Sequence, residues 1–357
     1  MDGVKALMEV FARGKSPPLE DLQKILIASK RQHEVLPNVV RVAIPTRTPA
    51  NTATTESEST RLPRDPPGGL VVCGDTHGQY TDLIGMIFSD KVAGFPSPEN
   101  VFIFNGDFVD RGENSLGVII TLLAIKLASP SALHLIRGNH ESIIMNERFG
   151  FTAELKVKFP NDHCELFRLF TETFNALPLA AVIEDRVFVV HGGVGPVTYK
   201  MTLAEIDKLN RFRQPDFADL PLDSMREVDG FTSQKEREMN SMGELLWSDP
   251  VENFSGFKRN SRGGGTTAFG ADATRFFLST NKLQYMIRSH VMQAKGYSVG
   301  HEGRCVTVFS APNYCNGQNL GAVLRYRDPT KVTDPEVLQY KAVSQAKAKA
   351  KAAEAMG

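Results

Sequence analysis

The hydrophobic residues between positions 69 and 176 follow two spacings, one typical of strands and one typical of helices. Short continuous apolar runs predict strands, and longer stretches with an apolar residue every three or four positions predict helices. The predicted strands are 69–73, 101–105 and 133–137, and the helices after them are 79–89, 114–128 and several within 141–176. Such alternation is typical of a parallel or mixed sheet covered by helices. The sequence therefore predicts an α/β fold.

The pattern changes in the second half of the chain. The segment 180–193 predicts a hairpin of two short strands around Glu184 and Asp185, and a helix is expected at about 202–212. An amphipathic helix is also expected near the start of the chain, at 19–35. Later apolar runs predict the strands 285–290, 304–311 and 320–326.

Polar stretches without periodicity suggest the boundaries of one main domain. Segments rich in Thr, Ser and Pro, or in Ala and Lys, have too few large apolar groups to form a core of their own. The expected organisation is a helical segment at 1–45 packed on the main domain, a flexible linker at 46–67, the main domain at 68–330 with a surface insertion at 216–243, and a C-terminal tail at 331–357.

Charge and composition exclude several function classes. The 357 residues include 41 basic and 41 acidic side chains, so no overall field attracts nucleic acid or a membrane surface. No apolar run approaches the roughly 20 residues of a membrane span, and the N-terminus lacks the apolar core of a signal peptide. The four cysteines form no CxxC pair and are expected to be reduced thiols. We expect a cytoplasmic or nuclear protein that binds neither nucleic acid nor membrane.

Three polar motifs directly follow the first three predicted strands. They are GDTHGQ at 74–79, FNGDFVDRG at 104–112 and IRGNHES at 136–142. In open α/β sheets, ligands bind at the ends of strands, so we expect the side chains of these motifs to meet. The candidate metal ligands, with two histidines from later runs, are Asp75, His77, Asp107, Asn139, His191 and His290.

This mixture of carboxylate, imidazole and amide oxygen suits manganese, iron or zinc better than calcium. Two divalent ions that share a bridging carboxylate lie about 3.5–4 Å apart in proteins. Such a pair lowers the pKa of a shared water and neutralises charge on a phosphoryl group. The sequence therefore favours a two-metal centre that acts on a phosphate compound.

Other groups in the motifs suit proton transfer and anion binding. His140 follows Asn139 directly and, beside a metal site, can protonate a leaving alkoxide, with Asp110 as the carboxylate that orients it. The guanidinium of Arg111 suits bidentate binding of phosphate oxygens. For Arg137, binding of an anion and an ordinary ion pair are equally good interpretations.

Each of these residues alone also has a structural explanation. A single Asp after a strand, such as Asp75, is usually a helix cap or a turn residue. A core His such as His191 is more often a hydrogen-bonded structural residue than a ligand. The functional interpretation rests on the set, because GDxHG, GDxVDRG, RGNHE, HGG and SH occur together and in this order.

The ordered motifs resemble those of the PPP family of serine/threonine phosphatases, within the calcineurin-like metallophosphoesterases. The resemblance extends from about residue 36 to residue 326 and includes LLWSDP at 245–250 and FSAPNYC at 309–315. It is greatest to the type 5 and EF-hand branches, although the sequence shows neither tetratricopeptide repeats nor an EF-hand loop. The resemblance implies a central β-sandwich of mixed sheets flanked by α-helices.

The resemblance also implies a role for each candidate residue. The implied ligands are Asp75 and His77 for a first metal ion, Asn139, His191 and His290 for a second, and Asp107 as the bridge between them. His140 is the implied general acid, supported by Asp110, while Arg111, Arg262 and Tyr314 bind the substrate. The segment RGGGTTAFG has one residue more between Arg262 and its FG than the family pattern, which leaves the placement of this arginine open.

The implied activity is hydrolysis of phosphoserine and phosphothreonine in proteins, by in-line attack of a hydroxide that two metals activate. The expected metal in vitro is manganese, with iron or zinc as alternatives. Phosphoproteins are the expected substrates, and regulatory proteins are possible partners. Two alternatives stay open: a phosphoesterase of the same fold that acts on a dinucleoside polyphosphate or another small phosphate, and an inactive phosphatase-like protein that binds partners.

Overall fold

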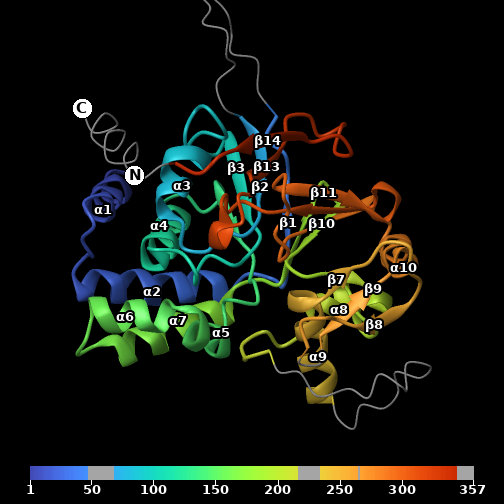
Figure 1. Ribbon diagram of the computed structural model, residues 1–357, viewed down its shortest axis with the longest axis horizontal. Coiled ribbons are helices and arrows are strands. Elements are labelled where there is room, and N and C mark those ends of the chain that lie inside the picture. Colours follow the sequence, from blue (N-terminus) through green and yellow to red (C-terminus); the bar gives the residue numbers. More distant parts are fainter. Residues whose placement is uncertain (47–67, 216–233, 264–265, 344–357) are drawn as a thin grey trace, which may run out of the picture.

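Two facing β-sheets with helices on their outer sides form the body of the protein, seen in a computed structural model that describes residues 1–46, 68–215, 234–263 and 266–343 (Figure 1). Sheet A has the strand order β1-β5-β6-β10-β12-β11, and sheet B has the order β14-β13-β2-β3-β4. A small third sheet has the order β7-β9-β8. Both large sheets contain parallel and antiparallel pairs, which confirms the predicted fold class.

The strands of sheet B carry the three motifs at their ends. Strands β2, β3 and β4 are parallel neighbours, and β13 pairs with β2 in the antiparallel direction. The strands of the described chain are β1 Val39–Val42, β2 Gly69–Cys73, β3 Asn100–Phe104, β4 Leu133–Leu135, β5 Ala180–Ile183, β6 Val187–Val190, β7 Asp249–Pro250, β8 Phe257–Arg259, β9 Thr267–Phe269, β10 Tyr285–Arg288, β11 Tyr297–Gly300, β12 Cys305–Val308, β13 Gly321–Tyr326 and β14 Glu336–Tyr340.

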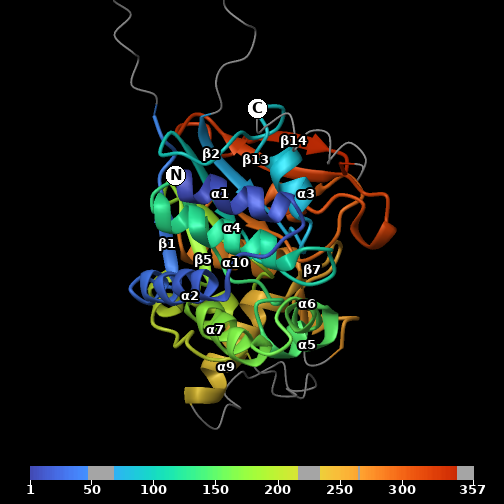
Figure 2. The ribbon, with the colours of Figure 1, turned by 90° about the vertical axis from the view of Figure 1, so that its left-hand side faces the viewer.

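The helices form a layer on the outer side of each large sheet. Helices α1 and α2 pack on α4, and α2 also packs on α7, so the N-terminal segment lies against the sheet B side (Figure 2). The α-helices of the described chain are α1 Asp2–Ala12, α2 Leu19–Glu34, α3 Tyr80–Asp82, α4 Ser115–Ala128, α5 Ile143–Phe149, α6 Phe151–Lys158, α7 His163–Ala176, α8 Leu203–Asp207, α9 Gln234–Trp247 and α10 Ala271–Thr280.

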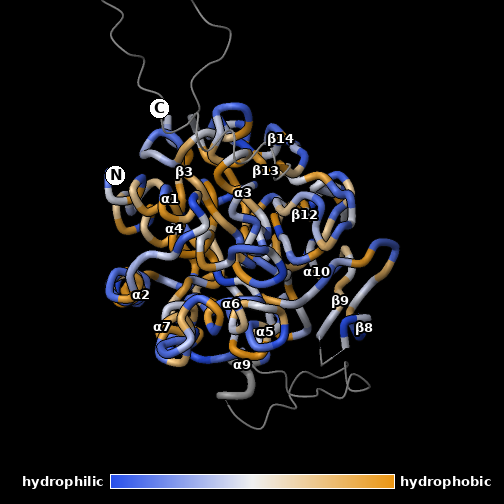
Figure 3. Tube along the Cα trace, turned by 60° about the vertical axis from the view of Figure 1, so that its left-hand side comes forward, coloured by the Kyte–Doolittle hydropathy of each residue, from blue (hydrophilic) through white to orange (hydrophobic). Residues whose placement is uncertain are grey.

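The apolar core has three layers, one between the sheets and one under each helical layer. In Figure 3, hydrophobic residues gather along inner segments of the trace such as β3 and α4. Val72 of β2 and Ile103 of β3 meet Val189 of β6 and Ile287 of β10 between the sheets. Helix α4 is apolar around nearly its whole circumference because helices pack on it from one side and sheet B from the other. The sandwich thus holds the strand ends of both sheets in fixed positions.

Two helices differ from the prediction. The helix expected at 79–89 is a single turn, α3, followed by a π-helical stretch at Leu83–Ile87. The helix expected at about 202–212 ends at Asp207, because the side-chain amide of Asn38 binds the carbonyls of Ile206, Asp207 and Leu209. These bonds satisfy carbonyl groups that a continuing helix would have used.

The predicted insertion and tail also differ from the structure. The insertion at 216–243 overlaps helix α9, whose residues Met242 and Leu245 are fully buried in the layer under sheet A. Strand β14 pairs with β13, so sheet B continues beyond residue 330. The linker after residue 46, the segment 216–233 and the tail from 344 lie outside the described residues.

Two further properties bear on the sequence analysis. No helix among the described residues is long and apolar enough to span a membrane. All four cysteines lie in described parts of the chain and none forms a disulfide; Cys73 and Cys305 are buried, while Cys164 and Cys315 are exposed.

A buried histidine gives the fold a testable pH dependence. His33 of α2 is fully buried, with Nδ1 2.7 Å from the carbonyl oxygen of Ser29. Burial, aided by the positive charges of Lys126 and Arg211, lowers the pKa of His33 from 6.5 to about 4. As the pH falls below 6.5, the unfolded chain therefore binds a proton that the folded chain does not, and the fold loses stability.

We predict that this histidine removes about 2 kcal/mol from the free energy of unfolding between pH 7 and pH 4.5. Urea unfolding of the wild type and of His33→Gln at both pH values measures the effect, with His163→Gln on α7 as the control. The His33 variant should lose less stability on acidification than either other protein. An equal loss in all three proteins would contradict the prediction.

Candidate metal centre and phosphate site

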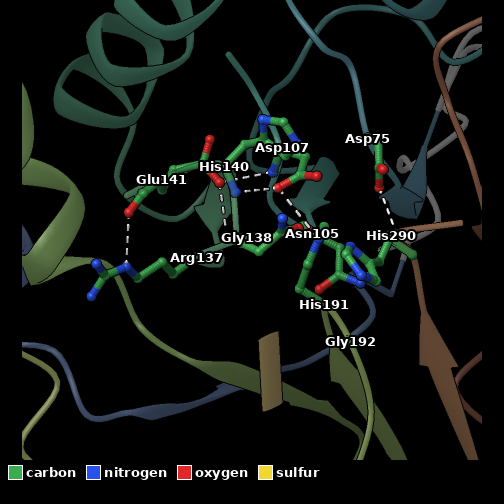
Figure 4. A network of polar contacts seen from close by, with 12 residues as sticks. Asp75, Asn105, Asp107, Arg137, Gly138, His140, Glu141, His191, Gly192 and His290 are labelled. Atoms are coloured by element: carbon green, nitrogen blue, oxygen red, sulfur yellow. Dashed lines mark hydrogen bonds and ion pairs between the residues drawn. The ribbon is translucent and has the colours of Figure 1, made fainter. Parts of the chain in front are cut away.

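Five strands from the two large sheets end at the site. Asp75 follows β2, Asp107 follows β3 and Asn139 follows β4, while His191 and His290 follow β6 and β10 of the facing sheet. Figure 4 shows His191 and His290 close to Asp107 at this edge. A parallel bridge between Asp75 and Phe309, just after β12, joins the two sheets here. The six residues proposed as metal ligands are all buried.

The backbone of the site has strained segments. His77, Asp107 and His290 have positive φ angles of 41°, 52° and 67°. Non-glycine residues rarely adopt such angles, and they persist at functional sites where the surroundings hold them. Gly106 explains how two loops approach so closely, because a Cβ atom there would lie 2.4 Å from the Cα atom of Gly138.

The carboxylate of Asp107 lies between two groups of ligand atoms. Its Oδ2 is 3.6 Å from Nε2 of His77, and its Oδ1 is 3.3 Å from Nε2 of His191. His77 Nε2 is also 3.6 Å from Oδ2 of Asp75. Asp107 is thus the side chain that both groups share, as a bridging ligand must be.

The second group gathers around Asn139. Its side-chain amide lies 2.9 Å from His191 Nε2 and 2.8 Å from His290 Nδ1. Both Asp107 oxygens are 3.2 Å from the same amide group. Several buried atoms with lone pairs therefore converge, an arrangement that a cation stabilises.

The donor set fits two divalent ions. Oδ1 of Asp75 accepts a hydrogen bond from the backbone of His290, but its buried Oδ2 has no hydrogen-bond partner among the described residues. A buried carboxylate oxygen without a partner is costly unless a cation binds it. Within the described chain, His77, Asp107 and His140 form one potential metal-binding cluster, and Asp107, His191 and His290 form another.

Electrostatics keep the shared carboxylate ionised. Burial alone would raise the pKa of Asp107, but the neighbouring His191, His140 and His77 hold it well below its usual range. Burial lowers the pKa of His191, and the Asp107 charge outweighs this effect and raises it to about 9. The cluster therefore retains the carboxylate charge that a metal ligand needs.

The predicted proton donor and its orienting carboxylate are in contact. His140 Nδ1 lies 2.8 Å from Asp110 Oδ2. Asp110 is itself held by the side chain of Asn146 and by the backbone N–H of Phe151. This arrangement occupies Nδ1 of His140 and leaves Nε2 available for proton transfer.

The predicted substrate-binding side chains surround the same site. The exposed Arg111 guanidinium lies over the ring of Phe149, 3.8 Å from its centre. Arg262, whose placement the sequence left open, donates to the backbone oxygen of His290 at 3.2 Å and pairs with Asp249 at 2.7 Å. The Tyr314 ring stacks on His77 at 4.8 Å. All three therefore lie beside candidate metal ligands or the general acid pair.

Sequence reasoning missed the groups that hold the ligands. The carboxylate of Glu141 accepts from the backbone N–H groups of Asp107, Phe108 and Gly138. The carbonyl oxygen of Asn105 lies 2.7 Å from His191 Nδ1, which fixes the ring so that Nε2 faces the cluster. Asn105 lies inside the motif at 104–112 and Glu141 inside the motif at 136–142, and this membership was the signal that could have identified them.

Arg137 forms no ion pair with the residues that the structure describes, and its side chain is not exposed for binding phosphate. Its side chain is fully buried, and its guanidinium donates to the carbonyls of Glu141, Arg211 and Arg213 and to the side chain of Asn175.

Comparisons with known proteins agree with this geometry. Residues 69–294 match the calcineurin-like phosphoesterase family. Serine/threonine-protein phosphatase 5 from Solanum lycopersicum is 37% identical over 96% of this chain and 52% of its own length. Serine/threonine-protein phosphatase T from Trypanosoma brucei brucei is 43% identical over 72% of this chain and 48% of its own length. The chain thus spans about half the length of these curated relatives.

A solved structure resembles nearly the whole chain. It is a protein serine/threonine phosphatase from Saccharomyces cerevisiae with similarity to human phosphatase PP5. The two share 32% identity with a TM-score of 0.73, over 94% of this chain and 93% of the other. Together with the ligand cluster at the strand ends, these similarities show that the chain belongs to the calcineurin-like phosphoesterase family, in its branch of PPP-type serine/threonine phosphatases.

Proposed function

We propose that this protein hydrolyses phosphoserine and phosphothreonine in other proteins, with two metal ions bound at the ends of the strands. The central observation is the position of Asp107, whose carboxylate lies between two groups of buried ligand atoms. The His140–Asp110 pair lies beside it, since the backbone N–H of His140 donates to Asp107 Oδ1 at 2.9 Å. A two-metal centre next to a proton donor suits hydrolysis of a phosphate ester.

The metal ligands divide into two sets. Asp75 and His77 would hold one ion, Asn139, His191 and His290 would hold the other, and Asp107 would bridge them. Bound ions would activate a water molecule for in-line attack and stabilise the charge on the phosphoryl group. Manganese is the proposed metal in vitro, with iron or zinc as alternatives, because all three accept this mixture of oxygen and nitrogen ligands.

The remaining side chains bind the phosphate and transfer the proton. Arg111 and Arg262 would hold phosphate oxygens, because guanidinium groups bind them bidentately. Tyr314 would close one side of the site by its contact with His77. His140, oriented by Asp110, would protonate the oxygen of the departing serine or threonine.

Phosphoproteins are the proposed substrates, and other proteins are the proposed regulators of access to the site. We propose the cytoplasm and the nucleus as its location, since the unpaired cysteines suit a reducing compartment.

The direct test is hydrolysis of a phosphothreonine peptide by the purified protein, with and without manganese. A dinucleoside polyphosphate is assayed in parallel, and bound metal is measured by elemental analysis. Metal-dependent release of phosphate from the peptide, with about two metals per chain, is the expected result. Turnover of the dinucleotide alone would favour the small-phosphate alternative. Loss of both metal and activity would favour a protein that only binds partners.

We predict that Asp107→Asn nearly abolishes turnover, because an amide bridges two cations far less well than a carboxylate. The metal content should fall at the same time. Asp162→Asn, at the exposed start of α7, is the control and should change neither quantity. Retention of both metals and of the wild-type rate would refute the bridging role.

The variant His140→Asn should instead keep its metals and lose a factor of roughly 10²–10⁴ in turnover of the phosphothreonine peptide, the usual contribution of a general acid. The loss should be smaller for para-nitrophenyl phosphate, whose leaving group needs little protonation. Steady-state kinetics on both substrates measure this difference, with His163→Asn as the matched control. An equal loss on the two substrates would argue against proton donation by His140.

A further inference from the structure

Arg137 is a fully buried cation that forms no hydrogen bond or ion pair with a carboxylate among the described residues. Its Nε donates to the Glu141 carbonyl at 3.1 Å, and its Nη1 donates to the carbonyls of Arg211 and Arg213 at 3.2 and 2.9 Å. Its Nη2 donates to Oδ1 of Asn175 at 2.8 Å. Burying a charge is costly, and here only neutral oxygens accept hydrogen bonds from the guanidinium, while the Glu141 carboxylate stabilises it by its charge alone. Such a site calls for a specific explanation.

A second buried arginine continues this network. Nε of Arg211 donates to the carbonyl of Ala176, the last residue of α7. Its Nη2 donates to the carbonyls of His33 and Leu36, at and just after the end of α2. Helix C-termini carry free carbonyls and partial negative charge, so they are favourable places for a buried guanidinium. Arg211 thus binds the ends of two helices, and its own carbonyl accepts from Arg137.

The other end of the network is the loop that carries the general acid. Arg137 precedes Gly138 and binds the carbonyl of Glu141, so it holds both ends of the Gly138–Glu141 turn that contains His140 (Figure 4). The Glu141 carboxylate in turn accepts from the backbone N–H of Asp107 at 2.8 Å and of Gly138 at 2.9 Å. Bonds therefore run without a break from the end of α2 to the loop of His140.

A further contact holds the same loop from its other side. The side-chain oxygen of Gln214 accepts from the backbone N–H of Ile143, at the start of α5. The Gln214 amide donates to Asn175, which also accepts from Arg137. Asn175 of α7 is thus linked to both ends of the segment that contains His140, through Arg137 on one side and Gln214 on the other.

From this network we propose that Arg137 and Arg211, here called the arginine pair, are positioning residues that hold the His140 turn in the geometry needed for proton donation. This inference rests on the proposed function. It also gives the N-terminal helix α2, which lies outside the family match at 69–294, a role in the chemistry of the site. The arginine pair does not touch the substrate, since both side chains are buried and each donates four hydrogen bonds to protein oxygens.

Substitution by lysine tests the arginine pair most directly. Lysine keeps the positive charge but lacks the planar guanidinium that donates to several acceptors at once. Arg137→Lys and Arg211→Lys are compared with Arg168→Lys, an exposed residue of α7 whose ion pairs lie on the surface. If either lysine variant fails to fold, Asn175→Ala is used instead, because it removes the oxygen that accepts from Arg137 Nη2. Asn175→Asp keeps an oxygen at that position and should restore the wild-type behaviour.

The kinetic measurement is turnover of a phosphothreonine peptide against turnover of para-nitrophenyl phosphate. A displaced general acid should lower peptide turnover by roughly tenfold to 10²-fold, with a smaller loss on the aryl phosphate and unchanged KM and metal content. Arg168→Lys should match the wild type on both substrates. Equal losses on the two substrates, or no loss at all, would overturn the proposal.

A spectroscopic measurement tests the inference even if the wild type hydrolyses neither substrate, an outcome that would reject the proposed function. In zinc-loaded protein with nitrogen-15 histidine, the Nδ1–H signal of His140 reports its bond to Asp110. His140→Asn identifies the signal. We expect it to shift or broaden in the lysine variants and to stay unchanged in Arg168→Lys. An unchanged signal in all variants would overturn the positioning role.

Discussion

One buried carboxylate, shared between two groups of ligand atoms, constrains most of this structure. For Asp107 to face both groups, strand ends from two different sheets must meet within a few ångströms, and a sandwich provides this meeting point. The close approach requires Gly106 and Gly138, where a side chain would collide with the neighbouring loop. It also requires positive φ angles at His77 and His290. The free energy of these strained positions is offset by the packed core around them.

The surrounding polar groups follow from the same constraint. Loops that converge so closely cannot satisfy their own backbone groups, so side chains supply the missing partners. The Glu141 carboxylate accepts from backbone N–H groups of two such loops, at Asp107 and at Gly138, and Arg137 donates to the backbone carbonyl of Glu141. Arg211 connects these hydrogen bonds to the C-terminal ends of α2 and α7, because its guanidinium donates to backbone carbonyls there. The helices that cover sheet B therefore contribute to the site as well as to the core.

The sequence predicted the parts of the fold that local patterns encode. Strands β2 and β3 were predicted to within a residue because each is a continuous apolar run before a glycine-containing motif. Strand β1 was missed because four residues carry little periodicity, and it pairs with β5, far along the chain. The polar sequence of α9 concealed a helix, because its buried residues 240–246 include the polar Asn240, Ser241 and Glu244 and so show no apolar periodicity. The candidate site residues were predictable from the sequence motifs. The second sheet was predicted only from the family resemblance. The role of Arg137 depends on tertiary contacts that no local sequence pattern records.

The central claim is that two metal ions share Asp107 at the junction of the two sheets. Anomalous diffraction at the manganese absorption edge, from crystals of the protein grown with manganese, tests it most directly. The account predicts two anomalous peaks about 3.5–4 Å apart on either side of the Asp107 carboxylate. A single peak, or peaks that Asp107 does not contact, would contradict it.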